Sequence, residues 1–320
     1  MDVRNVEALV TSVGSEGYVS ADDVLFLRRN VFADGIVSRS ELEAVFALGE
    51  RAPDGDREWP QFFEEVCADF FLNEEEPRGY FTSSEFTVVK SLVTRDGHKA
   101  SLLELSVLVR LLEKAVSTPH ELADFVADQF RLLIDQKQGG PAIGEQDTEL
   151  LRRYLYASGG AGSIAITKDE AELLFDLQDL TANADNHPAW CDLFIKAIAA
   201  HLMQHVGYKP LPREEALRLH DWVKDQSVNP GGFFNRMFSG GLSSIRESYG
   251  RKSIVATRNE DDEIARAIAE QVTAREADWL ADRIGRDGKL ADTERALIAY
   301  MKELEAELPP KLQALVSNAA

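Results

Sequence analysis

Acidic side chains follow Asp-Gly pairs at similar distances in several parts of the chain, and carboxylate oxygens are the ligands that calcium prefers. The pairs and their acids are Asp34-Gly35 with Glu41, Asp96-Gly97 with Glu104, and Asp287-Gly288 with Glu294. A twelve-residue calcium loop needs oxygen ligands at positions 1, 3, 5 and 12 and a glycine at position 6. The spacing therefore makes divalent metal binding, with Ca2+ as the cofactor, one chemistry that the sequence allows.

The turns fill the ligand positions to different degrees. With Gly35 at position 6 the candidate ligands are Asn30, Asp34 and Glu41, while Phe32 occupies position 3. With Gly55 at position 6, Glu50 and Asp54 fit, and Gln61 stands where a bidentate glutamate is expected. The fullest oxygen set is Thr181, Asn183, Asp185 and Asp192, and the last turn keeps Asp287 and Glu294. The stretch 181–192 is thus the best predicted calcium site.

The same acids also have a structural explanation, which the sequence leaves open. Asp-Gly is a common tight turn. Ser38 and Glu41 form the S-x-x-E pattern of a capping box, in which the glutamate accepts a hydrogen bond from a backbone amide at the helix start. In this alternative the acid serves its own helix and binds no metal.

In its D-G-x5-E turns between helical segments, the chain resembles the EF-hand family and also the bacterial tellurite-resistance TerB-like helical domains. The resemblance covers the turns and their flanking helices, and positions 1 and 3 of the loops depart from the calcium-binding pattern. It implies an all-helical fold and divalent metal held by acids of this kind.

Apolar residues recur at helical spacing along most of the chain, which predicts an all-α protein. Residues 17–35 (GYVSADDVLFLRRNVFADG) match residues 79–97 (GYFTSSEFTVVKSLVTRDG), so we expect about four related helix-turn-helix units, the last truncated. The expected domains are two three-helix units in 1–135, a third in 136–207, a helix with an arm in 208–262, and a partial unit in 263–320. Trp59 and Trp190 each begin a W-x3-F pattern and are predicted to be core anchors.

The composition excludes several classes of protein. A net charge of -20 opposes binding to nucleic acid or anionic lipid. We see no signal peptide and no apolar run as long as a transmembrane helix. The two cysteines, Cys67 and Cys191, lie in apolar helical patterns typical of buried thiols, so we expect a cytoplasmic location.

Catalytic signatures are missing, and we expect the protein not to be an enzyme. Neither a nucleophile elbow nor a phosphate-binding glycine loop occurs. His201 and His205 stand four residues apart on one predicted helix, a spacing that can bind zinc if a third ligand comes from elsewhere. The more ordinary interpretation is two histidines near a helix end.

The segment 229–259 is basic and aromatic within an acidic chain, and glycines interrupt its helical pattern. We call it the arm. Its candidate partner-binding residues are Phe233, Phe234, Arg236, Met237, Phe238, Arg246, Arg251 and Lys252. Such a segment fits an acidic protein partner or a membrane surface, or it folds back on the acidic body of its own chain.

The leading hypothesis is a non-enzymatic binding or regulatory protein. The alternative is a divalent metal binder of the calcium-sensor or tellurite-resistance type. An enzyme without a recognisable motif is the third.

Overall fold

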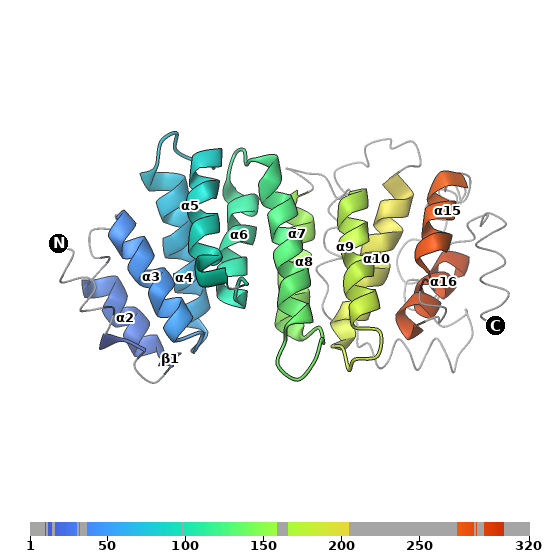
Figure 1. The fold of residues 1–320 in the computed structure, drawn as a ribbon, viewed down its shortest axis with the longest axis horizontal. Coiled ribbons are helices and arrows are strands. Elements are labelled where there is room, and N and C mark those ends of the chain that lie inside the picture. Colours follow the sequence, from blue (N-terminus) through green and yellow to red (C-terminus); the bar gives the residue numbers. More distant parts are fainter. Residues whose placement is uncertain are drawn as a thin grey trace, which may run out of the picture. The chain divides into compact units, whose positions relative to one another are not determined.

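The computed structural model describes residues 10, 12–14, 17–30, 32, 37–97, 99–158, 166–204, 274–284, 286 and 291–303. These residues are mostly helical, which confirms the all-α class (Figure 1). The chain forms two compact bodies. The N-terminal body holds Met1–Pro141 and Glu149–Ser163, and the C-terminal body holds Ala142–Thr148 and Ile164–Ala320.

The N-terminal body is a stack of helices joined by short connections. Its helices are α2 (Ala21–Asn30), α3 (Arg39–Arg51), α4 (Glu58–Asp69), α5 (Ser83–Val93), α6 (Leu102–Lys114), α7 (His120–Asp135) and most of α8 (Glu145–Ser158). Two shorter elements are the π-helical turn η1 (Phe70–Glu74), which continues α4, and the 3-10 turn η2 (Arg95–Gly97). The most extensive packing between these helices joins α4 with α6 and α6 with α7, so α4 and α6 form the centre of this body.

Aromatic side chains of α4 fill the core of the N-terminal body. Trp59, Phe62 and Phe63 are fully buried, and the ring of Trp59 lies 5.5 Å from that of Phe63. The indole Nε1 of Trp59 donates to the carbonyl oxygen of Ala52 at 3.1 Å, so the one polar atom of this side chain is satisfied. The ring of Phe46 on α3 completes the cluster, 5.4 Å from Phe63.

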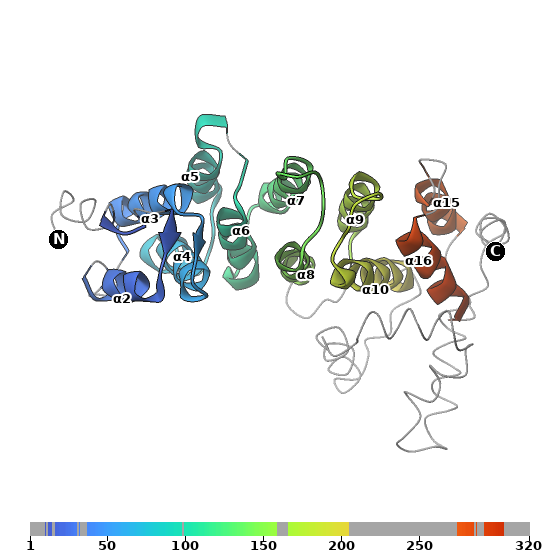
Figure 2. The same cartoon turned by 90° about the horizontal axis from the view of Figure 1, so that it is seen from below.

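Short parallel backbone pairings fix where the helices of this body begin. β1 (Tyr18–Val19) precedes α2 and pairs with β2 (Asp54–Gly55), which precedes α4. Figure 2 shows both strands beside α2, α3 and α4. A single parallel bridge, Tyr80 with Ser117, stands in the same relation to α5 and α7. Glycines open both segments at positive φ, 77° at Gly17 and 80° at Gly79, a conformation that other residues rarely adopt.

The C-terminal body contains the helices α9 (Lys168–Leu180), α10 (Pro188–Gln204), α15 (Ala274–Arg283) and α16 (Asp292–Glu303). α10 packs against both α16 and α9. The segment that leads into α10 is bonded to the segment that leads into α8: the amide of His187 donates to the carbonyl oxygen of Ile143 at 2.8 Å. Among the described residues, no helix is both long and apolar enough to span a membrane.

The two tryptophans predicted to anchor the core occupy similar surroundings. Trp59 is 0% exposed and Trp190 is 1% exposed, and each stands near the start of its helix. Trp190 lies 5.9 Å from Phe194 between ring centroids, and its Nε1 donates to Oε1 of Gln178 at 2.9 Å. The prediction that both are buried anchors is confirmed.

Candidate functional site

The acids that follow the first two Asp-Gly pairs are bonded to the starts of their own helices. Oε2 of Glu41 accepts hydrogen bonds from the amide of Ser38 at 2.8 Å and from its Oγ at 2.7 Å. Oε2 of Glu104 accepts from the amide and from Oγ of Ser101, both at 2.8 Å. Both glutamates are buried, and both helices start with a complete capping box. The hydrogen bonds of Glu41 and Glu104 are therefore those of helix-capping residues, as the structural explanation predicted.

The same arrangement occurs at other helix starts. Complete capping boxes also join Thr82 with Glu85 at α5 and Thr167 with Glu170 at α9. Oε2 of Glu294 accepts from the amide of Ala291 at 2.8 Å, at the start of α16. The T-x-x-E patterns in TSSE and TKDE were the sequence signal for the first two of these boxes.

We expect Thr82→Ala to lower the free energy of unfolding of the N-terminal body by about 1 kcal/mol, because it removes the side-chain acceptor of the α5 capping box. Ser83→Ala, at the exposed next position inside the helix, is the control and should change stability by less than about 0.5 kcal/mol. Urea denaturation followed by circular dichroism measures both. Equal effects of the two changes would contradict the capping role.

Of the four residues in the best predicted calcium site, two are bonded to other residues of the protein and two are exposed to solvent. Oγ1 of Thr181 donates to the carbonyl oxygen of Leu177 at 2.7 Å and accepts from Nδ2 of Asn186 at 3.1 Å. Oδ2 of Asp192 lies 2.8 Å from Nζ of Lys196 in an ion pair. The other two members, Asn183 and Asp185, are exposed. Thr181 and Asp192 therefore already have partners within the protein.

The remaining predicted ligands are dispersed. Nδ2 of Asn30 donates to the carbonyl oxygen of Phe26 at 2.8 Å, and Asp54 is an exposed residue of β2. Asp34 and Asp287 lie outside the described residues. Within the described part of the chain, no group of three or more His, Cys, Asp or Glu side chains is placed to hold a metal ion.

His201 is a core histidine. It is 2% exposed, and its Nδ1 donates to the carbonyl oxygen of Ile166 at 2.8 Å. Its ring packs edge to face on Trp279 of α15, with 5.2 Å between the centroids. His205 lies outside the described residues. The ring of His201 thus connects α10 with α15 and with the residue two positions before the start of α9.

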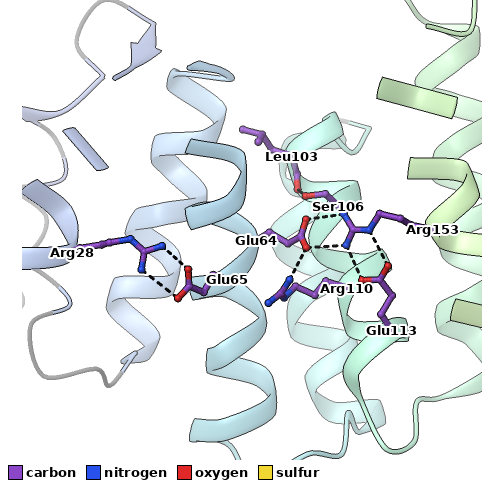
Figure 3. Close-up of polar contacts among 8 residues, drawn as sticks. All are labelled: Arg28, Glu64, Glu65, Leu103, Ser106, Arg110, Glu113 and Arg153. Carbon is purple, nitrogen blue, oxygen red and sulfur yellow. Dashed lines mark hydrogen bonds and ion pairs between the residues drawn. The ribbon is translucent and has the colours of Figure 1, made fainter. Parts of the chain in front are cut away.

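A cluster of charged side chains, which the sequence did not indicate, joins α4, α6 and α8 (Figure 3). We call it the Glu64 cluster; its members are Glu64, Arg110, Glu113 and Arg153. Glu64 is 9% exposed and lies between two guanidinium groups, with Nη1 of Arg110 at 3.0 Å and Nη2 of Arg153 at 2.8 Å. Arg153 also binds Glu113 with two parallel hydrogen bonds, of 2.9 Å from Nε and 2.8 Å from Nη2.

The Glu64 cluster balances two carboxylates with two guanidinium groups, so the charges of these partly buried side chains are compensated. The hydrogen bonds to Glu113 raise the pKa of Arg153 above its usual value, although burial acts in the opposite direction. Arg153 therefore keeps its charge at every physiological pH. A permanent charge bonded to two acids suits the attachment of helices rather than proton transfer.

Neither thiol has the properties of a nucleophile. Burial raises the pKa of Cys67 well above its usual value, and burial raises the pKa of Cys191 to about 11. Since the thiolate is the reactive form, both side chains are almost wholly protonated at neutral pH. This agrees with their predicted role as small apolar residues inside helices.

Comparison of the chain with protein-family models, curated proteins and solved structures found no match. The likeness to EF-hand and TerB-like proteins therefore stays a prediction from the turns. The arm, residues 229–259, with all its predicted partner-binding side chains, lies outside the described residues.

Proposed function

We propose that the chain is a non-enzymatic, cytoplasmic binding or regulatory protein whose body is a series of related three-helix units. The three complete units would be α2 to α4, α5 to α7 and α8 to α10, with α15 and α16 as a partial fourth. In each complete unit, a backbone hydrogen bond joins the segment before the first helix to the segment before the third. The donor amide lies before the third helix in each case: Asp56 donates to the carbonyl oxygen of Val19 at 3.0 Å, Val116 to that of Gly79 at 2.7 Å, and His187 to that of Ile143 at 2.8 Å.

This recurring bond is the observation that carries the proposal. A unit that closes in the same way three times supports a repeat architecture, and stacked helical repeats commonly provide extended surfaces for partners. The burial of Trp59 and Trp190 at the start of α4 and α10 points in the same direction. The bonds of Glu41 and Glu104 within their capping boxes favour a structural role for these acids over a metal-binding one.

The arm is the proposed partner-binding segment. It carries five basic residues and one acid, whereas the whole chain has a net charge of -20. Its aromatic side chains gain free energy by leaving water, and its cations suit an acidic protein surface. An anionic membrane surface is the alternative ligand, because it too offers negative charge and an apolar environment.

Reversing the charge of the arm tests this proposal. The variant Arg236→Glu, Arg246→Glu, Arg251→Glu and Lys252→Glu should lose a stoichiometric protein partner that the unchanged protein retains after cross-linking in its own cells. The control carries the same charge change at exposed positions of the N-terminal body: Arg29→Glu, Arg57→Glu, Arg78→Glu and Lys114→Glu. Retention of all partners by the arm variant, or equal loss from both variants, would contradict a role for the arm. If the unchanged protein sediments with anionic vesicles and the arm variant does not, the ligand of the arm is a membrane surface and not a protein.

Calcium binding at 181–192 is the second candidate function, and the exposure of Asn183 and Asp185 favours it because solvent ions reach both side chains. If the site binds calcium, Asp185→Ala should weaken the affinity by at least tenfold, since it removes a carboxylate ligand. Isothermal titration of a chelator-stripped sample measures the affinity. The control is Asp169→Ala, an exposed acid in the first turn of α9, which should leave it unchanged. No heat of binding at millimolar calcium would eliminate this candidate.

A further inference from the structure

An acid occupies the same position in the second helix of each proposed unit. Glu50, Glu113 and Asp179 stand nine residues after the capping glutamates Glu41, Glu104 and Glu170. Each is the last residue but one of its helix, in α3, α6 and α9 respectively. We call these three residues the junction acids. The sequence continues the pattern in α16, where Glu303 stands nine residues after Glu294.

This position is unfavourable for an acid as far as the helix itself is concerned. The carboxyl end of a helix carries partial negative charge, so a carboxylate there is destabilised by its own helix. An acid that recurs at the end of three helices therefore calls for an interaction outside its own helix.

Each junction acid forms an ion pair with an arginine of the next unit. Glu50 Oε1 lies 3.5 Å from Nε of Arg95, in the turn after α5. Glu113 Oε2 lies 2.8 Å from Nη2 of Arg153 in α8, and Asp179 Oδ2 lies 3.9 Å from Nη2 of Arg283 at the end of α15. The first two pairs lie within the N-terminal body and the third lies within the C-terminal body.

We propose that the junction acid joins consecutive units: its carboxylate binds an arginine of the three-helix unit that follows it. This inference rests on the proposed repeat and adds the chemistry of its junctions. The acid occupies the same position in each unit, whereas the position of the arginine varies. Arg95 lies in the turn after the first helix of the next unit, Arg153 in the middle of such a helix, and Arg283 at the end of one. A long side chain with several donors tolerates such shifts, because it reaches the same carboxylate from different starting points.

The environment of the junction pairs predicts different strengths. The side chain of Arg283 is 6% exposed, and its guanidinium lies over the ring of Phe175 at 5.2 Å. Arg283 also pairs with Asp176 at 2.8 Å and with Glu172 at 3.3 Å, both nearer than Asp179, so at this junction the acid at the helix end shares the arginine with two other carboxylates of α9. The Arg95 and Glu50 side chains are 38% and 46% exposed, which leaves this pair the most open to solvent screening. The first junction should be the weakest.

A double-mutant cycle tests the proposal at the second junction. Glu113→Gln and Arg153→Gln should each speed hydrogen exchange of the amides in both α6 and α8 by roughly tenfold, and the double variant should add little to either change. The same cycle with Glu50→Gln and Arg95→Gln should give a smaller coupling. The change Arg153→Lys should recover only part of the protection, since lysine cannot reproduce the two parallel bonds to Glu113.

Arg39 and Glu43 provide the matched control, because this pair has a separation of 2.8 Å but lies within one exposed turn of α3. Its cycle should show weak coupling, with any change in exchange confined to α3. Coupling at Glu113 and Arg153 no stronger than in the control, or exchange that changes only on one side of the junction, would overturn the proposal. The isolated protein suffices for this measurement, so its result is independent of the charge-reversal test of the arm.

Discussion

Trp59→Ala should lower the free energy of unfolding of the N-terminal body by about 3 to 5 kcal/mol. The indole is fully buried, and its ring contacts both Phe62 and Phe63, so truncation leaves a cavity in the centre of the core. It also leaves the carbonyl oxygen of Ala52 without its donor. Trp190→Ala should destabilise the C-terminal body to a similar extent, since Gln178 there loses its partner.

Urea denaturation followed by circular dichroism, together with hydrogen exchange, measures this effect body by body, because the two bodies need not unfold in one transition. Leu25→Ala on α2 is the control in the N-terminal body. Its side chain is 43% exposed, and the change should cost less than about 1 kcal/mol. A loss for Trp59→Ala within the range of this control would contradict its role as an anchor.

Local patterns in the sequence were sufficient for the helical class and for the start of one helix. The apolar periodicity predicted the helical class, and the S-x-x-E pattern predicted the capping box of Ser38 and Glu41, which the structure contains. Both signals act within a few residues, so they can be recognised without knowledge of the fold. The W-x3-F pattern identified Trp59 and Trp190 for the same reason.

Contacts between residues that are far apart in the sequence could not be predicted from it. Glu64 lies 46 residues from Arg110 and 89 residues from Arg153, and no local spacing connects these positions. The two-residue strands β1 and β2 are too short to show an alternating pattern. The choice between metal ligand and helix cap at Glu41 also required geometry, because the two roles use the same residue at the same spacing.

Glu64→Ala should lower the free energy of unfolding of the N-terminal body by about 3 kcal/mol, because it removes the carboxylate that compensates two partly buried guanidinium groups. The side chain of Glu64 is 12% exposed, and those of Arg110 and Arg153 are 34% and 27% exposed. After the change, Arg153 keeps only Glu113 among the acids of the Glu64 cluster, and Arg110 loses the carboxylate at 3.0 Å (Figure 3). Urea denaturation is the measurement.

The adjacent residue provides the control for this prediction. Glu65 also pairs with an arginine, Arg28, at 2.5 Å, but the two side chains are 51% and 44% exposed. The hydrogen bond from Arg28 lowers the pKa of Glu65, so this pair contributes at neutral pH and its contribution falls as the pH drops through that lowered pKa. Because solvent screens the pair, Glu65→Ala should cost less than about 1 kcal/mol. Equal losses for Glu64→Ala and Glu65→Ala would mean that burial does not distinguish the two ion pairs, and the Glu64 cluster would then have no special role in holding α4, α6 and α8 together.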